Sequence, residues 1–425
     1  MAIALLTIFM IIVMLFSLPI GFAMVLSTLL YIISSDSLTV TVISQRMYTS
    51  VGSYELMAIP FFILAGNIMN ATGITQSLVT FAGILVGHMR GALAQISIVV
   101  SMFFAGMSGS AAADATAVGS TLIPAMKKAG YQGAFAAAVV SSASTIGPII
   151  PPSIHMVLFA SLVSMSAAKL FIGGIFPGII MGIYLMIVTY FIARKRNFPR
   201  QERPGREVVI RTSVKVLPAL SLPVIIIVGM ISGFFTATEA AAIAVLMAFI
   251  LSIFIYRSLT FKILMDGLVD AVLSTGQIML IIGMAASFAW IMTAEGLPHL
   301  VSGLLLSISR DPSVILLLIT LGYFIGGCFM CPSPMLIMTV PIIYPLIRQL
   351  GIDPMVYGLV SIVSALIGQS TPPVGVCMYI SCSIAKCDIL SFTRESLPYY
   401  VAMIAVVVTI IYFPTLVTYL PSLMK

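Results

Sequence analysis

The stretches GPIIPPS at 147–153 and GQSTPPVG at 368–375 decide how this chain folds. Each interrupts an apolar segment with paired prolines, which lack a backbone N–H and end a regular helix. Inside a bilayer every backbone polar group needs a partner, so a broken helix persists only where protein or a watery cavity supplies one. One such break is as easily explained by a packing kink. Two breaks in matching places predict a binding site at membrane depth.

The rest of the sequence indicates that lipid is its main solvent. Of its 425 residues, 60% are hydrophobic and 8% are charged, and the mean hydropathy is +1.19. Soluble domains are roughly 45–50% apolar and about 25% charged. Apolar stretches long enough to cross a hydrocarbon core of ~30 Å recur at 2–33, 170–193, 236–256 and 397–420. We therefore expect an all-α integral membrane protein that keeps 2–33 as its first helix.

Two related halves emerge when the chain is compared with itself at an offset of 221 residues. Gly106 then aligns with Gly327, Gly147 with Gly368, and prolines 151 and 152 with prolines 372 and 373. In each half we expect an apolar re-entrant hairpin, a Gly/Pro-broken helix and a last spanning helix. The hairpins are expected at 92–128 and 313–349, and the broken helices at 133–165 and 355–385. An odd number of crossings between equivalent points predicts inverted repeats.

This organisation divides the chain into three parts. Residues 1–193 form the first repeat, 194–233 a basic loop with a linking helix, and 234–425 the second repeat. The formal charge of +7 is concentrated between Arg194 and Lys215. Excess Lys and Arg in short loops marks the cytoplasmic side, which explains this stretch better than nucleic-acid binding does. We expect a cytoplasmic N-terminus and a periplasmic C-terminus.

Three ionisable residues in or beside the apolar segments are candidates for a functional role. Asp114 follows the first hairpin tip in GMSGSAAAD (106–114), and is either a functional carboxylate or a favourable first-turn acid. Glu239 opens a helix where Thr236 or Thr238 is the cap, which favours a structural role. His155 follows the first break, and either lines a cavity or is a satisfied core histidine.

Enzyme functions find little support. The sequence has no phosphate-binding G-x-x-x-x-G-K-[ST] loop, no H-E-x-x-H and no G-x-S-x-G elbow. An intramembrane hydrolase built on Asp114 would lack a matching second group. The pair Cys328-x-x-Cys331 has no second pair and no nearby His, so we expect inert thiols rather than a metal site. We expect no cofactor.

Several strings resemble one family closely. They are LMAIPFFILAGNIMNATGI (56–74), FAGMSGSAAADATAVGSTLIPAMKKAGY (104–131), GPIIPPSIHMV (147–157), FTATEAAAIAV (235–245), PIIYPLIRQLGIDP (341–354) and IGQSTPPVG (367–375). They look like the DctM-like large subunit of tripartite ATP-independent periplasmic transporters, over nearly the whole chain. The resemblance implies an elevator-type secondary transporter of the bacterial inner membrane, with Na⁺ as coupling ion. It also implies a small membrane subunit and a periplasmic binding protein that delivers a small organic anion, a carboxylate or sulfonate.

The resemblance also implies site residues. The sodium-binding residues carried over are Gly106, Ser108, Ser110, Thr145, Gly147, Gly327, Met330, Gly368 and Thr371. The residues assigned to the substrate are Ser110, Asp114, Pro151, Ser153, Cys331, Ser333, Pro372 and Gly375. This chain departs from the family at Cys331, where an Asp is common, and at Ala237, where a Pro is common. A self-sufficient sodium/dicarboxylate carrier without a binding protein is the alternative.

Overall fold

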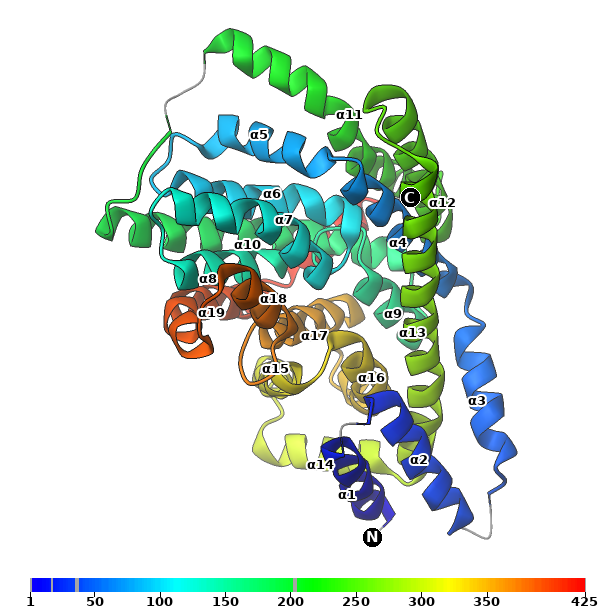
Figure 1. Cartoon of the computed structure of the whole chain (residues 1–425). Helices are drawn as coiled ribbons and strands as arrows, with labels where there is room; N and C mark the ends of the chain where they lie inside the picture. The colour runs from blue at the N-terminus through cyan, green and yellow to red at the C-terminus, as the bar shows by residue number, and fades with distance from the viewer. Residues whose placement is uncertain (1, 17, 35–37, 202–204, 425) are drawn as a thin grey trace.

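The computed structural model describes residues 2–16, 18–34, 38–201 and 205–424. This part of the chain is helical and contains no β-strand, which confirms the all-α prediction (Figure 1). The helices of the first half are α1 (Ala2–Leu15), α2 (Ile20–Ile33), α3 (Thr41–Val51), α4 (Ala58–Ala71), α5 (Ile74–Val86), α6 (Ala92–Ser108), α7 (Ala111–Lys128), α8 (Gly133–Ser144), α9 (Ile154–Val163) and α10 (Ala167–Lys195). A short 3₁₀ helix (Tyr54–Met57) precedes α4.

The remaining helices follow the basic loop. They are α11 (Arg206–Ile231), α12 (Ala237–Ile250), α13 (Phe261–Ala294), α14 (Leu297–Ile308), α15 (Pro312–Phe329), α16 (Pro332–Gln349), α17 (Pro354–Gln369), α18 (Val376–Ala385), α19 (Ile389–Tyr412) and α20 (Thr415–Ser422), with a π-helical turn (Leu251–Ile255) after α12. Within the described residues, six helices are long and apolar enough to cross a bilayer, and a seventh if the bent α11 is one span. A multi-pass membrane protein accounts for this pattern.

The two predicted hairpins and the two predicted breaks are present at positions related by the offset of 221 residues. Helices α6 and α7 form a hairpin over 92–128, and α15 and α16 form another over 312–349. Adding the offset to α7 gives the bounds of α16. The breaks lie between α8 and α9 and between α17 and α18. The inverted arrangement and the division into 1–193, 194–233 and 234–425 stay predictions.

Two expectations about local structure need correction. The apolar stretch 2–33 is two helices rather than one, because Pro19 stands at the N-cap of α2 and cannot continue a preceding helix. The basic stretch from Arg194 to Lys215 is mostly helical rather than a loop. Helix α10 runs to Lys195 and α11 starts at Arg206. Of the basic residues in this stretch, Arg203 lies outside the described residues, as does Lys425 at the C-terminus.

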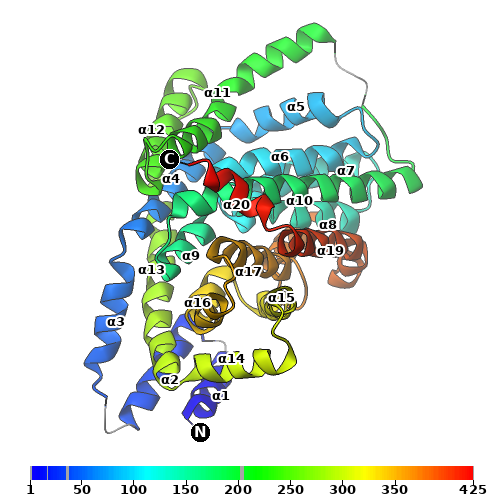
Figure 2. The same cartoon turned by 180° about the vertical axis from the view of Figure 1, so that it is seen from behind.

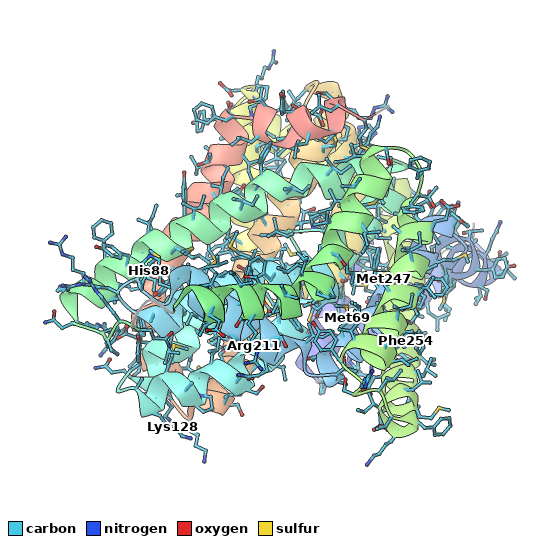
Figure 3. All side chains as sticks on the ribbon, turned by 90° about the horizontal axis from the view of Figure 1, so that it is seen from above. Met69, His88, Lys128, Arg211, Met247 and Phe254 are labelled. Atoms are coloured by element: carbon cyan, nitrogen blue, oxygen red, sulfur yellow. The ribbon has the colours of Figure 1, made fainter. Side chains whose placement is uncertain are left out.

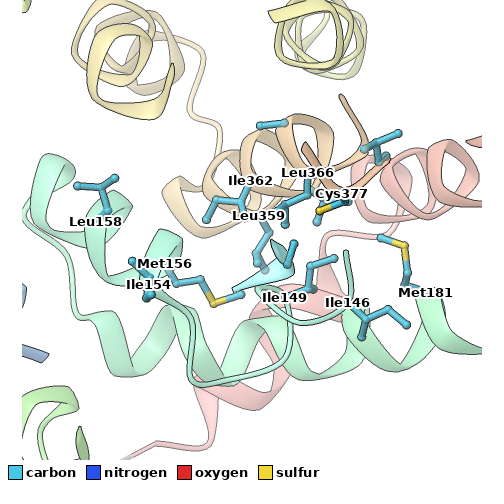
Figure 4. Close-up of a cluster of buried hydrophobic side chains, with 14 of the residues drawn as sticks. Ile146, Ile149, Ile154, Met156, Leu158, Met181, Leu359, Ile362, Leu366 and Cys377 are labelled. Atoms are coloured by element: carbon cyan, nitrogen blue, oxygen red, sulfur yellow. The ribbon is translucent and has the colours of Figure 1, made fainter. Parts of the chain in front are cut away.

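The first break is enclosed by apolar side chains from the other half of the chain. Ile146 and Ile149 of the first break are fully buried, and Figure 4 shows them beside Leu359 and Leu366 of α17. Farther along, Phe159 of α9 packs edge-on against Tyr357 of α17, with ring centroids 5.5 Å apart. The two broken helices therefore support each other, as non-helical backbone at membrane depth requires.

Long helices flank this centre. Helix α13 runs along one side of the molecule, with α3 and α4 against it (Figure 1). On the far side α20 lies across α10, as seen from behind (Figure 2). The first hairpin lies against α4 at Gly66, where an added Cβ would be 3.0 Å from the Met107 carbonyl oxygen. The absence of a side chain on Gly66 thus lets the hairpin tip approach α4 closely.

Candidate functional site between the two hairpin tips

The first hairpin tip is shaped by a glycine and a serine. Gly109 has a φ of 59°, in the left-handed region that favours glycine, and it ends α6. Ser110 then caps α7 by accepting a hydrogen bond from the Ala113 amide at 3.4 Å. The Ala111 and Ala112 amides are the first two of α7, and the opening amides of a helix have no intrahelical acceptor. The tip therefore presents backbone donors and serine hydroxyls together.

The first tip and the first break touch through their backbones. A Cβ added to Gly109 would lie 2.8 Å from the Pro152 carbonyl oxygen. One added to Gly147 would lie 3.7 Å from the Ser110 carbonyl oxygen. The Thr145 hydroxyl donates to the Ser142 carbonyl at 2.7 Å, so its oxygen keeps lone pairs free. The Ser110 carbonyl oxygen of the tip and the Ser144 carbonyl oxygen before the break thus both lie close to Gly147.

The second half repeats this contact. A Cβ on Gly327 would lie 2.5 Å from the Ala365 carbonyl oxygen and 3.1 Å from the Gly368 Cα. The Val374 amide donates to the Cys328 carbonyl at 3.0 Å, which ties the second break to the second tip. The Thr371 hydroxyl donates to the Ile367 carbonyl at 2.8 Å. The Pro–Pro bond is cis in both breaks.

The two tips differ in their donors. Cys331 occupies the N-cap of α16 and makes no side-chain cap. Pro332 and Pro334 stand where the first half has Ala111 and Ala113, so two of the opening amides of α16 are missing. Met330, which ends α15, contributes its amide to the Gly326 carbonyl at 3.0 Å. The second tip is therefore much poorer in N–H donors than the first.

One cavity of about 380 Å³ lies between the tips. From the hairpins it is lined by Ser108, Ser110, Ala111, Cys331, Pro332 and Ser333. From the broken helices it is lined by Ile154, His155, Gln369 and Val376. Both tips and both broken helices thus contribute to a single cavity. A volume in the range of ~300–1,000 Å³ is usual for small-molecule sites.

The sequence prediction found one wall of this cavity and missed the other. The opposite wall comes from α4 and α13 and carries the polar residues Asn67, Asn70, Ser274 and Gln277. Asn67 is held by a hydrogen bond from its amide group to the Gly267 carbonyl at 3.3 Å. Polar residues within apolar helices were the available signal, since such residues in membrane helices face the protein interior or a cavity.

Several predicted substrate residues lie outside the cavity lining. They are Asp114, Pro151, Ser153, Pro372 and Gly375, whereas Ser110, Cys331 and Ser333 do line the cavity. Ser153 is fully buried and caps α9 by accepting a hydrogen bond from the Met156 amide. Gly375 is the residue before α18. These five residues shape the breaks and the first tip from behind the cavity surface.

Asp114 points into the protein. It lies in the first turn of α7, but Ser110 provides the cap there. Its carboxylate is fully buried and neither oxygen has a hydrogen-bond partner. The Asp114 Cβ atom lies next to Gly147: a Cβ added to that glycine would be 3.7 Å from it. The carboxyl group therefore lies behind the first tip and break, outside the lining of the cavity.

The other singled-out residues are resolved by their contacts. Thr236 and Glu239 form a capping box, which confirms the structural interpretation of Glu239. His155 lines the cavity, and its Nδ1 atom has no hydrogen-bond partner, so it is not a satisfied core histidine. All five cysteines are free. No group of three or more His, Cys, Asp or Glu residues in the described part of the chain is placed to hold a metal ion.

An all-helical membrane protein whose broken helices and hairpin tips enclose one cavity has the form of a membrane transporter. The structure resembles that of the YdaH transporter of Alcanivorax borkumensis, with a TM-score of 0.66 at 13% identity, covering 87% of this chain and 86% of that one. Residues 7–416 match the family described as "Tripartite ATP-independent periplasmic transporter, DctM component". The chain belongs to that family.

Two named relatives span nearly the same length. The sialic acid TRAP transporter large permease protein SiaM of Vibrio cholerae is 35% identical over 405 residues, which cover 95% of each chain. The 2,3-diketo-L-gulonate TRAP transporter large permease protein YiaN of Escherichia coli is 35% identical over 400 residues, or 94% of each chain. These relatives are permeases and not enzymes.

Membership of this family settles the kind of assembly. The large permease of such a transporter works in the inner membrane with a small membrane subunit and a periplasmic binding protein. This assembly differs from the alternative of a self-sufficient carrier. The expectation of a three-part transporter is confirmed.

Proposed function

We propose that this chain is the permease of a sodium-coupled importer of a small organic anion, which the periplasmic binding protein delivers. The observation that carries the proposal is the single cavity to which both hairpin tips and both broken helices contribute. In secondary transporters, broken helices of two repeats meet at the binding site, where helix N-termini face anionic groups and unwound carbonyls face cations. SiaM is named as a sialic acid transporter and YiaN as a 2,3-diketo-L-gulonate transporter, and these names support an organic acid as the cargo here.

Sodium as the coupling ion is supported by the oxygen atoms at the two tip–break contacts. In the first half these come from Ser108, Ser110 and Thr145 around Gly106 and Gly147. In the second half they come from Thr371 and the backbone around Gly327, Met330 and Gly368. The Thr145 and Thr371 hydroxyls already donate their protons to backbone carbonyls, and such hydroxyls, like bare carbonyls, are acceptors that suit a hard cation. We propose these residues as the two sodium sites.

The geometry also suggests which parts move. The hairpins and broken helices pack on one another, while α4 and α13 form the opposite wall of the cavity. We propose that the first group is the transport unit and that α4 and α13 belong to the scaffold. An elevator movement would then carry the cavity with its cargo along the scaffold, changing the neighbours of Asn67 and Gln277.

Uptake in proteoliposomes tests this function. The chain is reconstituted with its small membrane subunit, loaded binding protein is added outside, and a Na⁺ gradient or a pH gradient is imposed separately. We expect accumulation with the Na⁺ gradient alone. Accumulation that the pH gradient drives without Na⁺ would refute sodium coupling, and accumulation without any binding protein would refute delivery by that partner.

A further inference from the structure

We infer that the cargo is a hydroxylated monocarboxylate of the sugar-acid type, bound with its one anionic group at the first hairpin tip and its neutral, hydroxyl-bearing body toward the second tip, α4 and α13. The inference rests on the proposed function, because it assigns a cargo to the same cavity. It follows from the difference between the two tips and from the side chains between them.

The first tip is the end suited to an anion. Two helix N-termini reach the cavity there, those of α7 and α9, through Ala111 and Ile154. Both helices have serine N-caps, Ser110 and Ser153. A helix N-terminus carries a partial positive charge and unpaired N–H groups. A carboxylate at this end would accept hydrogen bonds from the opening amides of α7 and from serine hydroxyls.

The second tip cannot serve a second carboxylate in the same way. Pro332 and Pro334 remove two of the opening N–H groups of α16, and the Cys331 side chain makes no cap. The α18 N-terminus beside it has no side-chain cap, and its opening amides are the donors that remain on this side of the cavity. No Lys, Arg, Asp or Glu side chain of the described residues lines this cavity. A second negative charge would therefore lose its hydration with few donors to replace it.

The cavity lining away from the α7 N-terminus is suited to hydroxyl groups. Its polar side chains are four carboxamides, two hydroxyls and one imidazole, namely Asn67, Asn70, Gln277, Gln369, Ser274, Ser333 and His155. Carboxamides both donate and accept hydrogen bonds, as sugar hydroxyls do. The Gln369 Oε1 and His155 Nδ1 atoms have no partner within the protein. Buried polar groups without partners cost free energy, so a ligand that satisfies them gains affinity.

Thermal unfolding of the purified complex of this chain with its small membrane subunit, in Na⁺ buffer, tests the inference. The probes are gluconate, succinate and mannitol: a hydroxylated monocarboxylate, a short dicarboxylate and a neutral polyol. We expect gluconate to raise the unfolding midpoint at about one-tenth of the concentration that succinate or mannitol needs, because ligand binding to the folded state raises the midpoint. Gln277→Leu should weaken the gluconate effect. Gln349→Leu, at the exposed end of α16, should not.

A second variant tests the role of the second tip. Pro332→Ala restores an N–H to α16, so it should lower the succinate concentration needed for the same shift. The inference is overturned if succinate is as effective as gluconate on the unchanged complex, or if gluconate produces no shift. Either result leaves sodium-driven uptake standing, whereas a failure of sodium-driven uptake would remove the proposed function itself.

Discussion

Gly327 is the residue at which the second hairpin and the second break come closest. A Cβ added to Gly327 would lie 2.5 Å from the Ala365 carbonyl oxygen, so there is no room for a side chain. Gly322, one turn and a half earlier in α15, has nothing within 4 Å of the same hypothetical atom. In the same helix, Gly327 is required by a close contact, whereas Gly322 has space for a side chain and serves as its control.

We expect Gly327→Ala to lower the thermal unfolding midpoint and abolish uptake, since overpacking costs about 1–3 kcal/mol and separates tip from break. Gly322→Ala should leave uptake intact and stabilise the helix by about 0.5–1 kcal/mol. Unfolding of both purified variants and uptake with each would measure this. Equal effects of the two substitutions would mean that the tip–break contact is unimportant.

The hydroxyls at the two proposed sodium sites allow a test of each half. Removing the Ser110 or the Thr371 hydroxyl deletes one hard oxygen ligand and keeps the fold. Ser110→Ala and Thr371→Ala should each raise the Na⁺ concentration for half-maximal uptake several-fold, by analogy with the loss of about 1 kcal/mol or more per hydrogen-bonding group. Ser232→Ala, at the exposed end of α11, is the control. Unchanged Na⁺ dependence in both variants would contradict the assignment.

At the scale of the element, helix α18 is held at both ends. Its first residue, Val376, lines the cavity, and the last carbonyl, that of Ala385, accepts a hydrogen bond from the Lys127 ammonium at 2.7 Å. Lys127 lies in the last turn of α7, so this bond joins the first hairpin to the second broken helix. A cation at a helix C-terminus also interacts favourably with the helix dipole.

Lys127→Met should therefore lower the unfolding midpoint by an amount that corresponds to about 1 kcal/mol, because it removes both the hydrogen bond and the dipole interaction. Lys128→Met changes the neighbouring exposed lysine and is the matched control. Calorimetry or intrinsic-fluorescence unfolding of both variants would decide. If Lys128→Met destabilises as much, the bond to Ala385 does not contribute.

For the whole molecule, the distribution of cations predicts its orientation in the membrane. Segments far apart in sequence meet at one end: the Gln201 amide donates to the Gly87 carbonyl at 2.9 Å, and Arg196 pairs with Glu395 at 2.9 Å. Figure 3 shows Lys128 and His88 on the same side of the molecule. Arg211 lies between that side and the labelled apolar residues Met247 and Phe254. This end therefore gathers the loops richest in Lys and Arg.

We expect this end to face the cytoplasm, because basic loops are retained on that side. A cysteine placed at Gln201 should react with a membrane-impermeant maleimide only in inverted vesicles. One placed at Lys169, which lies in the first turn of α10 and on the opposite side in the predicted topology, should react only from the periplasmic side. Labelling of Gln201 from the periplasm would reverse the predicted orientation.

The sequence by itself determined whatever depends on neighbouring residues and on solvent. The apolar composition required a membrane, paired prolines located both breaks, and the spacing of Thr236 and Glu239 located a helix start. One of the two local errors, at 2–33, came from giving apolar length more weight than Pro19. Each of these features arises from contacts within about one helical turn or from the free energy of transfer into lipid.

Only the tertiary structure decided which side chains share the cavity. Asp114 follows the tip in sequence yet points away from the cavity, because a helix turns by about a quarter of a circle per residue. Asn67 and Gln277 line it although far from either tip in sequence. Their polar side chains mark the inward faces of α4 and α13. Packing between helices distant in sequence decides that those faces meet the two tips at one cavity, and a single sequence does not contain that packing.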